Sequence, residues 1–354
     1  MKVVTVIGAR PQFIKAAVVS AAFRDTAGSV KEVLVHTGQH FDDPMSRVFF
    51  EQMMIPEPAY HLGVHSLSHG AMTGRMMELL EEVLLQEKPD ALMVYGDTNS
   101  TLAGALVASK LHIPVAHVES GLRSFDMLMP EEINRIVTDR LSRWLFCPTA
   151  TAVRNLEAEG FRSFPAEIIM NGDVMLDAAL RFRDLARKPE EIHDGEFILA
   201  TVHRPATTDN PAALTSVFHS LAAMAHTIPV VIPLHPRTSG MLSKYGVDTN
   251  LPGVTLIPPV GYLESLWLLQ HARMVVTDSG GLQKEAYFFS KPCLTLRDET
   301  EWKELVEAGV NITAGTSPEN IMTAFNILIN LRFVPDLSLY GNGEASRIIA
   351  KTLA

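Results

Sequence analysis

The chain has 354 residues, of which 47% are hydrophobic and 20% are charged, a balance typical of well-buried globular enzymes rather than disordered or fibrous chains. Its length exceeds that of one typical domain, so we expect two domains of Rossmann size. The formal net charge of -10 argues against a nucleic-acid partner, because such partners need a basic surface.

The cysteines and the N-terminus predict the compartment. Cys147 and Cys293 each lie in or beside an apolar, strand-like run, as expected for small buried residues in a reducing compartment. The opening run Met1 to Ile7 is too short for a signal peptide, and no apolar stretch is long enough to span a membrane. We therefore expect a cytoplasmic protein without membrane insertion.

The first predicted strand, Lys2 to Ile7, is short, apolar and rich in β-branched residues. A turn follows, and then a helical pattern from Phe13 to Phe23. Arg10 and Lys15 therefore fall near the carboxyl edge of this strand, where open α/β sheets bind ligands. A lone surface charge would be the ordinary explanation, but two cations at one turn favour contact with a phosphate or a carboxylate.

Three acidic residues follow later elements of the same half. Asp97 follows Gly96 at the end of the buried strand 91–95, Glu119 comes directly after the strand 114–118, and Glu131 follows Pro130, which is placed to start a helix. Carboxylates crowded at one sheet edge raise one another's pKa, which suits proton-transfer chemistry. The alternative for Glu131 is a plain surface ion pair with Arg135, four residues further along the helix.

The second half repeats the alternation of strands and helices. A strand over 197–202 ends on His203, which is either a polar cap of that strand or a functional group. A later strand, 274–277, leads into Asp278-Ser279-Gly280-Gly281 and a helix-compatible run from Leu282. A strand, a glycine turn and a helix N-terminus together present free backbone N–H groups, which bind anions and above all phosphate.

This turn also has an ordinary explanation. Ser279 is a suitable N-cap for the helix, and a capped strand-to-helix turn needs no ligand. Glu285 would lie about one turn into the helix, where a carboxylate could accept a hydrogen bond from a sugar hydroxyl.

The pattern as a whole predicts an α/β protein with two Rossmann-like, doubly wound domains facing a central cleft. The charged, proline-containing connection at 187–191 places the boundary between Phe164 and Lys188, and we divide the chain into 1–170 and 171–335. There is no G-x-G-x-x-G after the first strand and no P-loop motif, so neither NAD in its usual mode nor a P-loop ATPase is expected. Pattern alone stops at an enzyme that holds a phosphorylated ligand between its domains.

A set of motifs narrows this further. The run Gly8 to Lys15 resembles the opening signature of the non-hydrolysing UDP-N-acetylglucosamine 2-epimerases. Further runs similar to that family follow in the same order, namely Gly96-Asp97-Thr98, 117–123, 130–135, 277–281 and 340–346. The resemblance implies a GT-B fold, a homodimer, no required metal or other cofactor, UDP binding by the second domain, and a last segment, 336–354, that packs back on the first domain.

The resemblance also implies a reaction. The proton on carbon 2 of the sugar is not acidic, so such enzymes expel UDP from carbon 1 while a base removes that proton, and UDP then adds back to the resulting glycal. The implied acid/base residues are Asp97, Glu119 and Glu131, with His203 facing them, and the sequence does not say which carboxylate removes the proton. Diphosphate contacts are expected from Arg10, Arg135, Ser279, Gly280 and Gly281, and substrate contacts from Lys15 and Glu285.

One run departs from the family pattern. Where the N-acetylglucosamine enzymes carry an arginine, the run 300–304 has Trp302, and this resembles the branch acting on UDP-2,3-diacetamido-2,3-dideoxy-glucuronic acid for bacterial O-antigen. UDP-N-acetylglucosamine stays the alternative substrate, and a GT-B glycosyltransferase or a UDP-sugar sensor the alternative function. Candidates for binding the substrate carboxylate are Lys303, Arg123 and Arg237, and Gln39 and His40 lie where some relatives have a second, activating UDP-sugar site.

Overall fold

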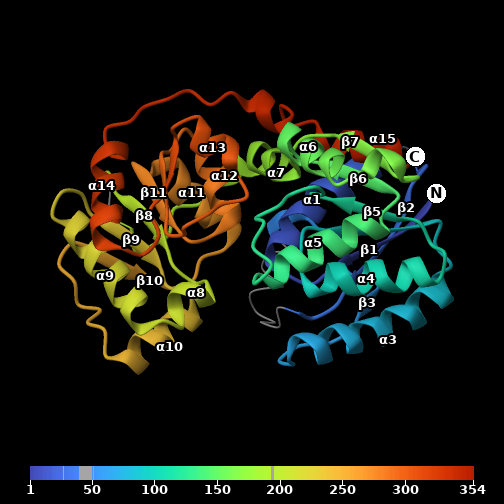
Figure 1. Ribbon diagram of the computed structural model, residues 1–354, viewed down its shortest axis with the longest axis horizontal. Coiled ribbons are helices and arrows are strands. Elements are labelled where there is room, and N and C mark those ends of the chain that lie inside the picture. Colours follow the sequence, from blue (N-terminus) through green and yellow to red (C-terminus); the bar gives the residue numbers. More distant parts are fainter. Residues whose placement is uncertain (27, 40–49, 51, 193–194) are drawn as a thin grey trace. The chain divides into compact units, whose positions relative to one another are not determined.

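The computed structural model describes residues 1–26, 28–39, 50, 52–192 and 195–354. The chain divides into two compact units (Figure 1). Unit 1 comprises Met1–Arg181 and Leu337–Ala354, and unit 2 comprises Phe182–Asp336. His40 lies outside the described residues, so its predicted role is not followed further.

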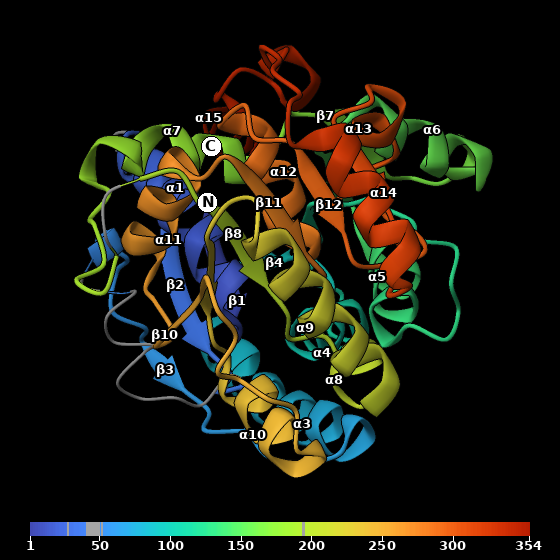
Figure 2. The same cartoon turned by 90° about the vertical axis from the view of Figure 1, so that its left-hand side faces the viewer.

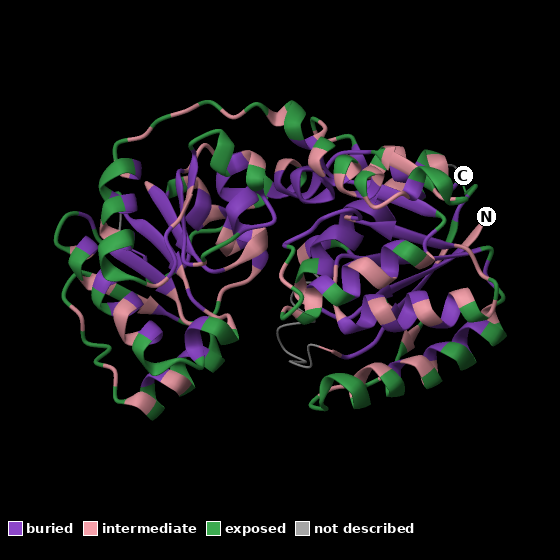
Figure 3. Cartoon of the chain, viewed as in Figure 1, coloured by how far each residue is buried: buried purple, intermediate pink, exposed green. Residues whose placement is uncertain are grey.

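The sheet of unit 1 is parallel, and its seven described strands run in the order β3-β2-β1-β4-β5-β6-β7. The strands are β1 Lys2–Ile7, β2 Lys31–His36, β3 Tyr60–His61, β4 Ala91–Tyr95, β5 Val115–Val118, β6 Trp144–Cys147 and β7 Glu167–Met170. The helices are α1 Arg10–Arg24, α3 His69–Glu87, α4 Asn99–Lys110, α5 Pro130–Leu141, α6 Ala150–Ala158, α7 Val174–Phe182 and α15 Ala345–Thr352, with short 3₁₀ turns at Phe161–Ser163 and Leu337–Tyr340. The central strands are apolar because helices cover both faces, and they are coloured as buried in Figure 3.

Unit 2 has a second parallel sheet, whose six described strands run in the order β10-β9-β8-β11-β12-β13. The strands are β8 Ile198–Thr201, β9 Val230–Pro233, β10 Val254–Ile257, β11 Met274–Thr277, β12 Cys293–Thr295 and β13 Asn311–Thr313. The helices are α8 Pro205–Thr208, α9 Pro211–Ala225, α10 Pro236–Tyr245, α11 Tyr262–His271, α12 Gly280–Phe288, α13 Lys303–Glu307 and α14 Pro318–Leu328, with a short 3₁₀ turn at Arg183–Leu185. Figure 2 shows β8, β11 and β12 side by side, as their pairing requires.

Each sheet reverses its winding direction at one place. In unit 1 the chain builds outward from β1 through β2 to β3, and then from β4 to β7 on the other side of β1. In unit 2 the corresponding reversal lies between β8 and β11. The carboxyl ends of strands at such a switch point form the crevice where doubly wound sheets bind ligands. The residues that follow β1, β4, β8 and β11 are therefore the ones to examine.

The boundary between the units lies later in the chain than the expected division at 170/171. Helix α7 stays in unit 1 because the Asp177 carboxylate accepts hydrogen bonds from the backbone N–H groups of Ala345 and Ser346, at 3.2 and 2.7 Å. Gly172, just before α7, has φ +88, and a Cβ there would lie 2.6 Å from the Tyr340 carbonyl oxygen. The C-terminal helix α15 also contacts α1, so the last segment belongs to the same unit as the N-terminus.

No helix within the described ranges is both long enough and apolar enough to cross a bilayer.

Candidate active site

The switch point of unit 1 places predicted site residues on two adjacent strand ends. Arg10 and Lys15 lie in α1, which follows β1, and Asp97 lies in the turn after β4. Strands β1 and β4 pair directly, so these turns are neighbours. Arg10, the first residue of α1, is partly exposed, whereas Lys15 is buried, with 5% of its surface exposed.

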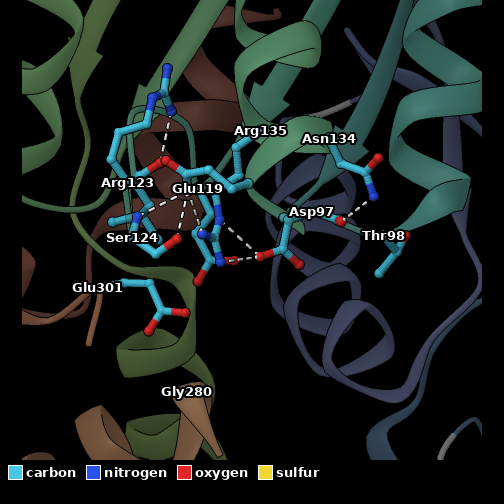
Figure 4. Close-up of polar contacts among 12 residues, drawn as sticks. Asp97, Thr98, Glu119, Arg123, Ser124, Asn134, Arg135, Gly280 and Glu301 are labelled. Carbon is cyan, nitrogen blue, oxygen red and sulfur yellow. Dashed lines mark hydrogen bonds and ion pairs between the residues drawn. The ribbon is translucent and has the colours of Figure 1, made fainter. Parts of the chain in front are cut away.

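Asp97 is held by two side chains of α5. Its carboxylate Oδ2 accepts hydrogen bonds from Arg135 Nε at 3.0 Å and Nη2 at 2.6 Å. Its backbone oxygen accepts a hydrogen bond from Asn134 Nδ2 at 2.8 Å, and Figure 4 shows both α5 side chains pointing toward it. The side chain of Asp97 keeps 30% exposure while that of Arg135 is 5% exposed, so the carboxylate is fixed and still reaches solvent.

Glu119 forms an ion pair with Lys15, and the two side chains are 12% and 7% exposed. Its backbone has φ 73, a conformation that costs energy for a residue with a side chain and that the surrounding contacts must hold. A Cβ at Gly96 would lie 3.2 Å from Glu119 Oε2 and 3.4 Å from Lys15 Nζ. The ion pair therefore packs directly on the turn that carries Asp97.

This pairing differs from the crowding of like charges that the sequence argument expected. Asp97 has a guanidinium partner and Glu119 an ammonium partner, so each carboxylate lies against a cation rather than against another carboxylate.

The two glutamates at the start of α5 have different surroundings. Glu132 is 1% exposed, and its carboxylate accepts hydrogen bonds from the backbone of Ser124 and Phe125 and from Arg135 Nη1 at 2.9 Å. Glu131 is only partly buried. Within the described part of the chain, the ion pair of Arg135 on its own helix is with Glu132 and not with Glu131. Glu131 therefore stays available for a ligand, and Glu132 serves the fold.

A buried polar network, not predicted from the sequence, lies behind these turns. His117 on β5 contacts the Asp139 carboxylate through Nδ1 and the Gly96 carbonyl oxygen through Nε2, both at 2.7 Å. Burial alone would raise the pKa of Asp139, but the hydrogen bond and charge of His117 and the Arg123 guanidinium hold that pKa below its ordinary value. The sequence motif 117–123 could have indicated this network, because it contains both His117 and Arg123.

Arg123 belongs to this network and is not a free cation. Its guanidinium donates to Asp139 Oδ2 at 2.7 Å and to both oxygens of Glu159 at 2.7 and 2.8 Å. The residue is 2% exposed. Arg123 therefore has no open face for the carboxylate of a substrate, in contrast to the sequence-based expectation.

In unit 2 the switch point carries His203 and the turn after β11. Asp278 is fully buried, and its carboxylate accepts hydrogen bonds from the backbone N–H groups of His203 at 2.9 Å and Arg204 at 2.9 Å. The imidazole of His203 is 40% exposed, and its Nδ1 lies 3.5 Å from Asp278 Oδ1. Asp278 thus fixes the backbone at His203 and leaves much of the ring accessible.

Helix α12 begins where the glycine turn predicted it. Ser279 occupies the N-cap position, but its hydroxyl makes no capping hydrogen bond to the first turn. A Cβ at Gly281 would meet nothing within 4 Å, so open space lies over this helix end. Glu285 lies further along α12 and is 7% exposed. The geometry is that of an anion site with uncapped N–H groups.

Trp302 packs behind the start of α12. Its indole Nε1 donates a hydrogen bond to the Gly280 carbonyl oxygen at 2.9 Å, and the Lys284 ammonium lies 4.4 Å from the centre of its ring. Trp302 is 3% exposed. Arg204 Nη2 lies 4.0 Å from Glu301 Oε1 and would be 3.5 Å from a Cβ at Gly280. An aromatic contact and a guanidinium thus border the helix N-terminus.

The other sequence candidates have ordinary partners or positions. Arg237 donates to both oxygens of Asp209 at 2.6 and 2.5 Å, and Lys303 is exposed at the start of α13. Gln39 Oε1 accepts hydrogen bonds from the backbone N and the hydroxyl of Ser100 at 3.1 and 2.7 Å. Among the described residues, no group of three or more His, Cys, Asp and Glu side chains is arranged to hold a metal ion.

Comparisons with known proteins identify the family. A family model described as UDP-N-acetylglucosamine 2-epimerase matches residues 23–354. The UDP-2,3-diacetamido-2,3-dideoxy-D-glucuronate 2-epimerase of Pseudomonas aeruginosa is 54% identical, over 100% of this chain and 99% of the relative.

Solved structures agree. UDP-GlcNAc 2-epimerase of Methanocaldococcus jannaschii, in complex with UDP-GlcNAc and UDP, has a TM-score of 0.92 and 40% identity, covering 100% of this chain and 99% of that one. The Neisseria meningitidis enzyme bound to UDP-GlcNAc has a TM-score of 0.87 and 30% identity, with the same coverage. These matches confirm the predicted GT-B type of α/β fold and the isomerase class, and the chain belongs to the UDP-N-acetylglucosamine 2-epimerase family.

Proposed function

We propose that this enzyme interconverts the carbon-2 epimers of UDP-2,3-diacetamido-2,3-dideoxy-D-glucuronic acid by eliminating UDP and adding it back. In the first step a carboxylate takes the proton from carbon 2. The C–H electron pair forms the carbon 1–carbon 2 double bond, and the carbon 1–oxygen bond breaks, with its electron pair leaving on the diphosphate of UDP. In the second step the diphosphate oxygen attacks carbon 1, and an acid delivers a proton to the opposite face of carbon 2, giving the manno epimer.

The observation that supports this proposal most strongly is the pair of anchored carboxylates in unit 1. Asp97 and Glu119 each have a cationic partner, Arg135 and Lys15, and both lie at the carboxyl ends of paired strands. Such positions suit groups that must accept and return a proton without moving. Glu131, which is partly exposed on α5, is the third acid/base candidate. We leave open which of the three carboxylates removes the proton.

We assign the binding of the released UDP to unit 2 and to Arg10. The uncapped start of α12, at Ser279, Gly280 and Gly281, suits a diphosphate, because helix N-termini favour anions. His203, with its accessible ring, and Glu285 are proposed to contact the substrate. Arg135 is already bound to two carboxylates, so we give it the positioning of Asp97 ahead of the diphosphate contact expected from sequence.

The choice of sugar follows the P. aeruginosa relative, which is 54% identical over its whole length. UDP-N-acetylglucosamine is the second candidate, because the M. jannaschii structure at 40% identity was solved with that nucleotide sugar bound. Trp302, in place of the arginine of the N-acetylglucosamine enzymes, favours the first substrate. With the first substrate, the product would serve O-antigen or other surface polysaccharide synthesis.

Two further proposals concern the setting of the enzyme. We propose a cytoplasmic location, supported by two cysteines that are both buried free thiols, as is common in reducing compartments. We propose a homodimer on the basis of the family resemblance, and light scattering coupled to size exclusion would measure its mass.

Proton NMR in deuterated water tests the function. The protein is incubated separately with each of the two UDP-sugars, without acceptor, metal or NAD. Deuterium at carbon 2 together with a manno product identifies the epimerase and its substrate. Sugar transfer only when an acceptor is added would point to a glycosyltransferase. Binding without exchange would point to a sensor, and Asp97→Asn and Glu119→Gln should then be indistinguishable from the parent.

A further inference from the structure

The buried pair of His117 and Asp139 contacts both turns that carry the anchored carboxylates. Both residues are 0% exposed, His117 on β5 and Asp139 on α5. His117 Nε2 lies 2.7 Å from the carbonyl oxygen of Gly96, the residue before Asp97. Asp139 Oδ2 accepts a hydrogen bond at 3.1 Å from the backbone N–H of Gly121, two residues after Glu119.

The contacts occupy both nitrogens of the ring. The Gly96 carbonyl oxygen can only accept a hydrogen bond, so Nε2 of His117 must donate. Nδ1 lies 2.7 Å from Asp139 Oδ1, and the other oxygen of that carboxylate accepts hydrogen bonds from Arg123 Nη1 and the Gly121 N–H at 2.7 and 3.1 Å. Both ring nitrogens of His117 therefore have buried partners, and neither is left for a substrate.

Bonds from outside each turn restrain its backbone. Gly96 has φ +62 and Glu119 has φ 73. The Gly96 N–H donates to the Val118 carbonyl oxygen at 2.9 Å, which links one turn to the other strand end. The hydrogen bond from His117 adds the second restraint on the same residue. Two bonds on Gly96 thus set the direction in which Asp97 leaves the strand.

We infer that His117 is a positioning residue for the epimerase, which sets the Asp97 carboxylate against Glu119 through its hydrogen bond to the Gly96 carbonyl oxygen. Asp139 orients the ring and holds the neighbouring turn. This inference rests on the proposed function for its kinetic consequence, but not for its structural consequence. The competing explanation is a buried ion pair that only stabilises the fold.

Two amide substitutions separate these explanations, because each keeps one half of the imidazole. His117→Gln places an amide nitrogen at the chain position of Nε2 and keeps the donor to Gly96, while it gives up Asp139. His117→Asn places its amide at the position of Nδ1 and keeps Asp139, while it gives up Gly96. If His117 positions Asp97, His117→Gln, which keeps the hydrogen bond to Gly96, should be more active than His117→Asn, which loses it. If the pair only stabilises the fold, the variant with the higher melting temperature should be the more active one.

Steady-state kinetics give the expected numbers. A displacement of about 1 Å at a catalytic group costs on the order of 100-fold, so His117→Asn should lose about 100-fold in kcat with KM changed less than about three-fold. His117→Gln should recover about ten-fold of that loss even where it melts at the lower temperature. The matched control is Thr138→Val, next to Asp139 on α5. Thr138 is 0% exposed, and among the described residues its hydroxyl has no hydrogen-bond partner, so kcat should not change.

A readout independent of turnover completes the test. Hydrogen exchange should speed up at the peptide spanning 96–98 in His117→Asn and stay slow there in His117→Gln, whether or not either UDP-sugar is the substrate. Equal exchange at 96–98 in both variants, or wild-type kcat in a folded His117→Asn, overturns the inference. A parent enzyme that turns over neither sugar while the exchange difference is found overturns the proposed function alone.

Asp139→Asn covers the case in which both His117 variants fail to fold. Its amide can donate to Nδ1 and leave a ring that still donates to Gly96, so kcat should fall less than about ten-fold. A loss near 100-fold in this folded variant would assign the effect to charge and overturn positioning by geometry.

Discussion

Arg135 is the side chain whose removal tests the site most directly. It donates to Asp97 Oδ2 at 3.0 and 2.6 Å and to Glu132 Oε2 at 2.9 Å, and it is 5% exposed at its side chain. Breaking a buried ion pair costs about 3–5 kcal/mol. At Asp97, whose side chain is 30% exposed, water recovers part of this lost free energy. Glu132 still accepts hydrogen bonds from the backbone N–H groups of Ser124 and Phe125. We therefore expect Arg135→Met to lower the free energy of unfolding by about 2–3 kcal/mol.

The effect on turnover should be larger than the effect on folding. Without the guanidinium the Asp97 carboxylate is free to rotate, and we expect kcat to fall by about 100-fold or more while UDP affinity changes little. Arg135→Lys should fall in between, because one ammonium cannot hold two carboxylates as a planar guanidinium does. Urea unfolding and the NMR epimerisation assay measure the two quantities.

The control is Arg347→Met, which removes an arginine of a comparable i, i+3 pair. Arg347 lies 3.3 Å from Glu344, and its side chain is 67% exposed, so solvent already screens the pair. We expect neither stability nor turnover to change measurably. Parent-like unfolding and kcat in Arg135→Met would refute the assignment of Arg135 to Asp97.

Three further predictions concern groups outside the anchored pairs. Burial raises the pKa of Glu32 above its ordinary value of 4.5, so the folded protein loses stability as pH rises from 4.5 through that raised pKa. Glu32→Gln should therefore melt at a higher temperature than the parent at pH 8, and this difference in melting temperature should disappear as pH falls toward 4.5. Burial also raises the pKa of the Cys147 and Cys293 thiols to about 12, so iodoacetamide at pH 8 should label neither in the native protein and both after unfolding, by mass spectrometry. Gly281→Ala should stabilise the fold by about 0.5–1 kcal/mol, because a Cβ there meets no other atom within 4 Å, yet it should weaken UDP binding measured by calorimetry. Gly240→Ala in α10, where a Cβ also meets nothing, should stabilise the fold without changing UDP binding.

The elements of the fold were predictable because each strand has a strong local signal. The strand expected over Lys2 to Ile7 is β1 with the same bounds, and the one expected over 274–277 is β11. The boundary between the units was harder to predict, because it depends on a contact between distant segments. Asp177 binds the start of α15, which no composition shift near residue 170 reveals.

The site shows the same division between local and distant information. A strand end predicts where Asp97 and Glu119 lie, because parallel strands deliver their carboxyl ends to one edge. It does not predict their partners, since the identity of the cation depends on how α1 and α5 pack on the sheet. The sequence predicted Arg135 as a diphosphate ligand, whereas in the structure it forms ion pairs with Asp97 and Glu132.

The same reasoning explains why α5 matters more than its sequence suggests. Residues 131–135 form one sequence motif, but their side chains have different partners. Glu131 is partly exposed, Glu132 binds the preceding loop, and Asn134 and Arg135 bind Asp97. One turn later Asp139 joins the buried network behind both turns. Since one rigid helix supplies all of these contacts, a shift of α5 would displace Asp97 and the turn after Glu119 together. Substitutions of Asn134, Arg135 and Asp139 should therefore show coupled rather than additive losses of kcat.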